Sequence, residues 1–282
     1  MMRYKPSPNT ASCLALLVFL LLGCKSETGK TTPESPGESP RWISLFNGKD
    51  LKDWQVKIRG YELGDNYKNT FRVEGGLLKV SYADYESYGA EFGHLFYKTP
   101  FSHYRLRAEY RFTGQQVAGG PDWAFRNNGF MLHSQSAASM GLEQDFPISL
   151  EAQLLGGREG EERPTMNLCT PGSNVFVNGE PRTEHCMNST SGTFPGEAWV
   201  TVEMVVLGDS VIHHLVEGDT VLTYTKPTMG GGAITGYDPA VYKEGKPMGS
   251  GYIAIQAESH PTEFRKIELL ELHPDGSPKS LP

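Results

Sequence analysis

Apolar and polar residues alternate along much of this chain with a period of two, the spacing typical of half-buried β-strands. In residues 104–112, Tyr104, Leu106 and Ala108 begin an apolar row that alternates with charged side chains. Turn sequences such as Glu74-Gly75-Gly76 separate the alternating stretches. Further strands are expected at residues 70–73, 77–82, 149–155, 199–207, 211–216 and 220–224, with a closing pair at 251–257 and 264–272. So many short strands predict an all-β fold, a two-sheet antiparallel sandwich of the jelly-roll or concanavalin A-like kind.

The first 24 residues lack this pattern and are typical of an export signal. Arg3 and Lys5 precede an apolar run at residues 14–22, which is too short to span a bilayer. The run ends in Leu21-Leu22-Gly23-Cys24, which resembles a bacterial lipobox, where the cysteine thiol is acylated. A plain signal peptide that happens to contain Cys24 is the alternative. A lipobox predicts a location in the cell envelope, lipid-anchored to a bacterial membrane and facing the periplasm or the cell surface.

The remaining composition divides the chain into three parts. Residues 25–40 contain no aliphatic or aromatic side chain, so they are expected to be a disordered tether. Residues 41–273 are expected to form one domain, and residues 274–282 a flexible tail. The net charge of −7 and the lack of a long basic run argue against nucleic acid as a partner. The membrane is expected to be a partner through the lipid anchor only.

Two cysteines remain once the signal is removed and Cys24 is acylated. Cys169 and Cys186 lie in a stretch rich in Gly, Pro, Asn and Thr. Export to an oxidising compartment favours a disulfide between them, and two free buried thiols are the alternative. No CxxC pair or Cys/His spacing indicates a structural zinc site.

Polar residues interrupt three of the expected strands. Glu151 and Gln153 lie opposite an apolar row, and so do Gln256 and Glu258. Arg265 has the parity of Ile267 and Leu269, so a charge continues an apolar row. Two interpretations remain open. The polar side chains form solvated outer faces with one snorkelling arginine, or they converge on a polar ligand at a concave face.

A family resemblance bears on this choice. Four segments resemble, in order, the motifs of the 3-keto-disaccharide hydrolase family, and together they cover roughly residues 42–272. They are Trp42–Leu51 with Trp54, Asn127–Phe130, Leu150–Leu154, and Gly251–Gln256 with Pro261 and Phe264–Ile267. The resemblance implies a concanavalin-like sandwich and an enzyme that cleaves 3-keto glycosides. Such chemistry proceeds by C2 proton abstraction, elimination and hydration, with net hydrolysis.

This chemistry suggests roles for individual residues. We expect Glu151 to be the base, Arg265 to stabilise the enolate or the ligand, and His133 to be either the acid or an ordinary half-buried histidine. The expected substrate-binding residues are Asn128, Gln153, Gln256, Glu258 and His260. Where the family commonly has Gln-Asp-His-Gly, this chain has Gln256-Ala257-Glu258-Ser259. The role of that histidine is therefore lost, moved to His260, or taken by Glu258.

Other interpretations of the same residues stay open. No cofactor is required, although a divalent metal could bind the donors Glu151, Glu258, His260 and Glu263. A non-catalytic carbohydrate-binding module would use aromatics such as Trp54, Trp123 and Tyr85 to stack on sugar rings. A purely structural envelope lipoprotein is a further alternative. The insert at residues 163–196, which contains both mature cysteines, suggests a subfamily with its own substrate.

Overall fold

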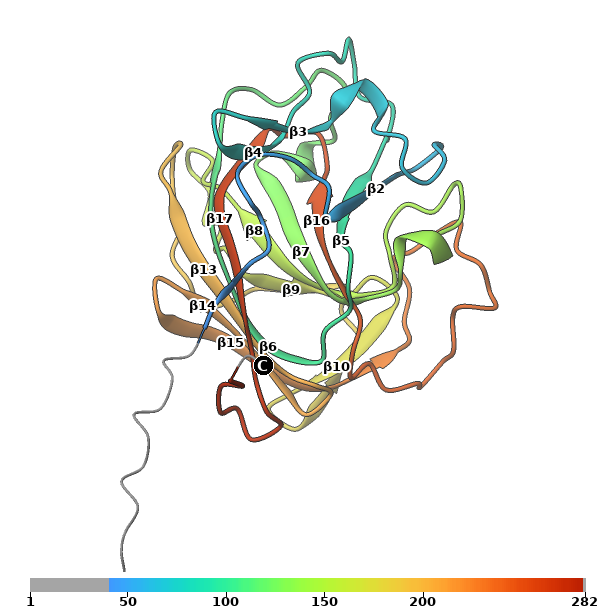
Figure 1. Cartoon of the computed structure of the whole chain (residues 1–282), viewed down its shortest axis with the longest axis vertical. Helices are drawn as coiled ribbons and strands as arrows, with labels where there is room; N and C mark the ends of the chain where they lie inside the picture. Colours follow the sequence, from blue (N-terminus) through green and yellow to red (C-terminus); the bar gives the residue numbers. More distant parts are fainter. Residues whose placement is uncertain (1–40, 281–282) are drawn as a thin grey trace, which may run out of the picture. The chain divides into compact units, whose positions relative to one another are not determined.

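The computed structural model describes residues 41–280. The expected signal peptide at residues 1–24, the lipidation site Cys24 and the tether at residues 25–40 lie outside the described residues. Within residues 41–280 the chain is nearly all β, and its strands form two antiparallel sheets (Figure 1). The predicted fold class, a jelly-roll or concanavalin A-like sandwich, is confirmed.

The larger sheet has ten strands. They are β1 (Ile43–Ser44), β3 (Phe71–Glu74), β4 (Leu77–Val80), β6 (His103–Phe112), β10 (Ser173–Val177), β11 (Glu180–Arg182), β13 (Val200–Leu207), β14 (Val211–Val216), β15 (Asp219–Met229) and β17 (Thr262–Glu271). Their order is β11-β10-β15-β14-β13-β6-β17-β4-β3, and β1 pairs with β17. The predicted hairpin is β3–β4, and the predicted meander is β13–β14–β15.

The smaller sheet has seven strands, in the order β12-β9-β8-β7-β16-β5-β2. They are β2 (Trp54–Ile58), β5 (Gly93–Tyr97), β7 (Asn127–Ser134), β8 (Leu150–Leu155), β9 (Asn167–Cys169), β12 (Cys186–Met187) and β16 (Tyr252–Ala257). Three short 3₁₀ helices lie between strands: η1 (Tyr67–Asn69), η2 (Asp122–Ala124) and η3 (Ala137–Ser139). None of the helices in residues 41–280 has the length and apolar character that crossing a bilayer requires.

The alternation of β6 shows how the sequence builds the core. Tyr104, Leu106 and Tyr110 are almost completely buried on its inner face. On its outer face Arg107 pairs with Glu268 at 2.7 Å and Arg111 with Glu263 at 2.6 Å. Ion pairs at a protein surface typically contribute only about 0–1 kcal/mol each, so we expect stability to come chiefly from the apolar row.

Two expectations about the end of the chain differ from the structure. The strands predicted as a closing pair, β16 and β17, belong to different sheets. A short polar connection has the same sequence pattern whether it joins neighbouring strands or crosses between sheets, which explains the error. The predicted tail also folds back as far as residue 280, because the Lys279 backbone N–H donates to Glu271 O and Leu272 bridges Pro278.

The outer face of the seven-stranded sheet is largely covered rather than solvated. Met131 and Ala254 point to this face and pack with Ala137 and Met140 from the segment after β7. Phe146 covers the edge of the same small cluster. This layer leaves part of the face open as a pocket.

Candidate functional site

A pocket of about 500 Å³ lies on the outer face of the seven-stranded sheet. In β8, Leu150, Ala152 and Leu154 face the core, so Glu151 and Gln153 point to this outer face. The polar lining of the pocket consists of Asn127, Asp145, Glu151, Gln153, His185, Thr235 and Glu258. The parity of β8 therefore brings together two residues that the sequence predicted to act at one site.

The Glu151 carboxyl group lies over the neighbouring strand β7 at Gly129. A Cβ atom at position 129 would lie 2.6 Å from Glu151 Oε1, so only glycine leaves room for this carboxyl group. Glu151 is 5% exposed, and burial raises its pKa to about 8 because desolvation disfavours the charged form. The glycine of the Asn127–Phe130 motif thus has a defined part in positioning Glu151.

Glu258 follows β16 directly and is also buried. Gln256 Nε2 donates to Glu258 Oε1 at 2.6 Å. Oε2 has no hydrogen-bond partner among residues 41–280. Burial and then the nearby Glu151 raise the pKa of Glu258 well above its usual range. Two neighbouring carboxyl groups with raised pKa values keep at least one proton near neutral pH, which is the requirement for paired acid and base chemistry.

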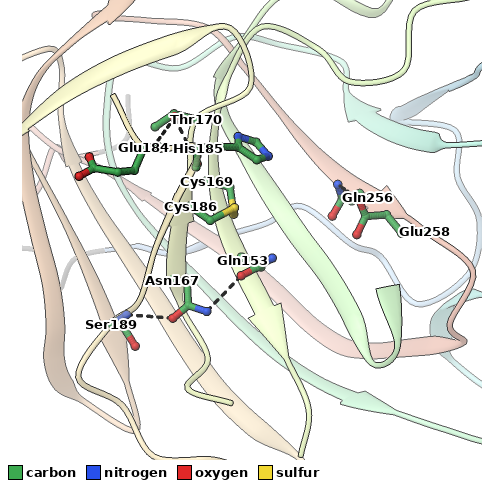
Figure 2. Close-up of a disulfide and its surroundings, with 10 residues drawn as sticks. All are labelled: Gln153, Asn167, Cys169, Thr170, Glu184, His185, Cys186, Ser189, Gln256 and Glu258. Carbon is green, nitrogen blue, oxygen red and sulfur yellow. Dashed lines mark hydrogen bonds between the residues drawn. A yellow bond between two sulfur atoms is a disulfide. The ribbon is translucent and has the colours of Figure 1, made fainter. Parts of the chain in front are cut away.

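Gln153 is held by a short chain of hydrogen bonds (Figure 2). Asn167 Nδ2 donates to Gln153 Oε1 at 3.0 Å, and the Ser189 backbone N–H donates to Asn167 Oδ1 at 2.8 Å. The side-chain oxygen of Gln153 thereby accepts a hydrogen bond from within the protein. The Gln153 NH₂ group remains to donate to an oxygen atom of a ligand in the pocket.

Cys169 and Cys186 form a disulfide that is part of the pocket wall (Figure 2). The two residues are direct partners in the antiparallel pairing of β9 and β12. Beside them lies His185, whose pKa is lowered by desolvation, which disfavours the charged imidazolium. The ligand atoms of these three residues lie within 4.8 Å of one another, but a disulfide offers no thiolate to a metal.

Aromatic rings form the opposite part of the wall. Trp123, in η2, stacks on Phe92 with the ring centroids 6.0 Å apart, and Phe92 packs against Phe146 at 4.9 Å. Trp123 remains 53% exposed, whereas Trp54 and Tyr85 are buried in the core. Of the three aromatics predicted to stack on a sugar, only Trp123 lines the pocket.

Arg265 is not part of this site, and its predicted role is wrong. A bulge between Phe264 and Lys266 shifts the register of β17, so Arg265 no longer shares the face of Ile267. Its guanidinium group pairs with Glu109 on the outer face of the ten-stranded sheet and stacks on Trp199 at 4.6 Å. The two sheets separate Arg265 from the pocket.

The predicted acid His133 also lies elsewhere. A positive φ of 48° at this residue accompanies a bulge between β7 and β16, which takes His133 out of the alternation. Its Nε2 lies 3.1 Å from Gly208 O, and its ring packs edge-on against Tyr104. His133 therefore does not line the pocket that contains Glu151.

Three of the predicted binding residues are buried outside the pocket lining. Asn128 Nδ2 donates to Gln256 O at 2.7 Å and faces the core, because its parity is that of Phe130. Gln256 does not line the pocket itself and instead holds Glu258. His260 packs edge-on between Phe112 and Phe125, and burial lowers its pKa to about 4.

The suggested metal donors do not converge. Glu263 pairs with Arg111 and Lys79 on the outer face of the ten-stranded sheet. His260 lies between aromatic rings, so only Glu151 and Glu258 remain at the pocket. These residues do not fit the four-donor metal site that the sequence suggested.

Several residues of the site were not predicted from the sequence, among them Asn127 and Asn167. Asn127 lines the pocket because it has the parity of Gly129, and this period-two pattern would have favoured it over Asn128. Asn167 lies in the insert at residues 163–196, where no periodicity indicates a strand. Only the pairing of β9 with β8 places Asn167 opposite Gln153.

The sequence of this chain matches the model of one protein family. Residues 41–270 match the model of the 3-keto-alpha-glucoside-1,2-lyase-like domain. No curated protein matches the chain. Among solved structures, a proposed glycosyl hydrolase from Parabacteroides distasonis ATCC 8503 is 15% identical, covers 82% of this chain and 94% of its own, and gives a TM-score of 0.48. The Bacillus licheniformis β-glucanase is 10% identical, with coverages of 83% and 98% and a TM-score of 0.43.

Proposed function

This chain belongs to the 3-keto-alpha-glucoside-1,2-lyase-like family, and from that premise we propose that it cleaves 3-keto glycosides in the pocket on the seven-stranded sheet. The family places the domain among carbohydrate-active proteins. The observation that supports the specific reaction is the buried pair Glu151 and Glu258, both with raised pKa values, in one pocket. Such a pair supplies a base and an acid to the same substrate.

The reaction follows from the acidity that a C3 ketone gives to the neighbouring C2–H bond. Ionised Glu151 removes the C2 proton, and the electron pair of that bond forms an enolate with the C3 oxygen. The enolate collapses with loss of the C1–O bond, and Glu258 gives its proton to the leaving oxygen. Water then adds across the C1=C2 bond, so the overall change is hydrolysis.

The surrounding residues favour this division of roles. Glu258 replaces His133 as the acid, because its Oε2 is buried, free of protein partners among residues 41–280 and at the pocket. The NH₂ group of Gln153, oriented by Asn167, donates to the developing enolate oxygen. Glu258 occupies the position of the histidine in the Gln-Asp-His-Gly motif of the family, and it therefore takes over the role of that histidine.

The test is release of the leaving alcohol from a chemically prepared 3-keto glucoside, for example 4-nitrophenol from 4-nitrophenyl 3-keto-glucoside, because the sugar product is 3-keto-glucose. Wild type should turn over the substrate, and Glu151→Gln should lose at least a thousandfold in kcat. Arg265→Gln is the matched control, because that residue lies on the other sheet. Equal activity of wild type and Glu151→Gln would refute the assignment of the base.

Trp123 supports a second candidate function, carbohydrate binding without turnover. An indole ring that is 53% exposed at a pocket is suited to stacking on a sugar ring. A binding module does not need two buried carboxyl groups with raised pKa values, so we favour the enzyme. Tight binding of unoxidised glycans with no turnover of any keto glycoside would support the module instead.

We also propose that the mature protein is anchored to a bacterial membrane through Cys24 and works in the cell envelope. The lipobox-like sequence Leu21–Cys24 supports this, and so does the disulfide, which persists in oxidising compartments. Metabolic labelling with palmitate should label wild type and leave Cys24→Ala unlabelled. Labelling of both would contradict the anchor.

A further inference from the structure

The lining of the pocket narrows the substrate. Resting on the proposed function, we propose that the pocket selects uncharged glycosides with an apolar leaving group and rejects glycosides that carry an anionic substituent. Three features of the lining support this selectivity: its charges, the position of its polar groups and the chemistry of its walls.

The charges of the lining are all of one sign. Asp145, Glu151 and Glu258 contribute carboxyl groups, and no lysine or arginine of residues 41–280 lines the pocket. His185 does little to compensate, because desolvation lowers its pKa and disfavours its cationic form. A carboxylate or sulfate group on the substrate would lose its hydration and gain no positive partner. The negative charge of that group would also raise the pKa of Glu151 and so reduce the fraction of Glu151 that is ionised and able to act as the base.

The polar groups are gathered where the sugar must react. Glu151 and Glu258 are only 5% and 2% exposed, so they lie deep in the pocket. Asn127 and Gln153 line the pocket with them, and Gln153 directly faces Gly129, which makes room for Glu151. A keto sugar needs a hydrogen-bond partner for most of its oxygen atoms, and these four residues provide such partners. The sugar ring is therefore placed at this polar floor.

The remaining walls have little to offer to hydroxyl groups. Apart from Asp145, Thr235 and His185, they consist of Trp123, Phe146, Pro171, Ala233, Ile234 and the Cys169–Cys186 disulfide. Asp145 and Thr235 also line the pocket, but they are engaged with each other, since Thr235 donates to Asp145 through its backbone N–H and its hydroxyl, both at 2.7 Å. A second sugar would leave its hydroxyl groups without partners here, whereas an alkyl or aryl group gains from apolar burial.

The rigidity of the walls increases the discrimination between leaving groups. The disulfide joins β9 to β12 on one side, and the stacked rings of Trp123 and Phe92 brace the other. Rigid walls favour the group that already fits, because little side-chain freedom is lost on binding.

The experiment uses a series of 3-keto glucosides with methyl, butyl and hexyl leaving groups. Their alcohols have nearly the same acidity, so kcat/KM reports burial rather than leaving-group chemistry. We expect an increase of about two- to fourfold per methylene group in contact with the walls, and at least tenfold from methyl to hexyl. A keto glucoside whose leaving group is glucose should react more slowly than the hexyl compound, and a 6-carboxylate analogue at least tenfold more slowly than its neutral parent.

Two variants test the position of the apolar subsite. Trp123→Ala and Ile234→Ser should reduce the ratio of hexyl to methyl substrate in kcat/KM by at least fivefold. Leu63→Ala, which removes an exposed apolar side chain outside the pocket, should leave the ratio unchanged. An unchanged ratio in both pocket variants would overturn the inference.

A binding measurement separates this inference from the proposed reaction. Calorimetric titration with the unoxidised methyl, butyl and hexyl glucosides should show affinity that rises along the series and is lost with a glucuronide. If that order is found but no keto glycoside is turned over, the proposed reaction fails and the selectivity stands. A flat series, no binding of any member, or preference for the disaccharide or the glucuronide would overturn the selectivity.

Discussion

Asn167 donates a hydrogen bond to Gln153 that decides which end of the Gln153 amide is available to a ligand. The bond runs from Asn167 Nδ2 to Gln153 Oε1 at 3.0 Å, and Asn167 is itself fixed by the Ser189 backbone N–H at 2.8 Å (Figure 2). Because the Gln153 oxygen is occupied, its NH₂ group is the end left for the substrate.

Asn167→Asp should therefore reverse the Gln153 amide. Aspartate still accepts from Ser189 but offers an acceptor to Gln153, which then turns its NH₂ group away from the pocket. We expect kcat on a 3-keto glucoside to fall by about 100-fold, the typical cost of one lost donor to a developing oxyanion, with a smaller change in KM. Asn188→Asp, which adds the same charge at an exposed neighbour, is the control. Equal kcat values for the two variants would rule out the role of Asn167.

Gly129→Ala should displace Glu151 without changing the fold. The added Cβ would lie 2.6 Å from Glu151 Oε1 and 2.7 Å from its Cγ, so the carboxyl group has to move. A shift of about 1 Å in a catalytic group commonly costs about 100-fold in rate. Gly192→Ala is the matched control, since its added methyl group would meet no atom within 4 Å. A turnover assay in which Gly129→Ala retains wild-type activity would contradict the placement of Glu151.

The pH dependence of turnover follows from the two carboxyl groups. Burial raises the pKa of Glu151 to about 8, and only its ionised form is a base. Burial and the nearby Glu151 raise the pKa of Glu258 well above its usual range, and we assign the proton of the pair to Glu258 because its buried Oε2 has no hydrogen-bond partner among residues 41–280. We expect kcat/KM to increase with pH up to about 8 and to decrease once Glu258 ionises. A rate that falls from about pH 6 to about pH 8 would contradict this assignment, because the assignment requires the opposite sign.

Loss of the disulfide should affect stability more than chemistry. The bond closes a loop with a sequence separation of 17, which predicts a contribution of about 3 kcal/mol to the free energy of unfolding. Replacing both Cys169 and Cys186 with alanine should lower the denaturant midpoint while leaving measurable turnover. Thiol titration of the unfolded, non-reduced mature chain should find neither sulfur free, and two reactive thiols from these positions would disprove the bond.

How much the sequence could predict depended on whether a residue lies in an unbroken alternation. Glu151 and Gln153 share the outer face that the alternation predicted, because β8 keeps a regular period of two. Arg265 and His133 were misplaced because each lies at a bulge, and one extra residue reverses the parity that follows. Bulges leave no clear signal in a single sequence.

Residues brought in by long-range pairing were equally hard to predict. Asn167 is fourteen positions from Gln153 along the chain, and only the pairing of β8 with β9 joins them. Glu258 was recognised as polar and close to the site, but its role as an acid depends on burial and on Glu151, which is on a strand far away in the sequence. Local patterns describe a strand, whereas a site depends on which strands are neighbours.

The most direct test of proton abstraction by Glu151 is exchange at C2 of the substrate. A 3-keto glucoside that resists elimination, such as one with a carbon-linked substituent at C1, is incubated in D₂O and followed by proton NMR. Wild type should replace the C2 hydrogen with deuterium, and Glu151→Gln should do so at least a hundredfold more slowly, because Glu151 is the base that removes this proton. Exchange at the same rate in both proteins, or none in wild type while it still releases the leaving alcohol from an O-linked keto glucoside, would contradict this role of Glu151.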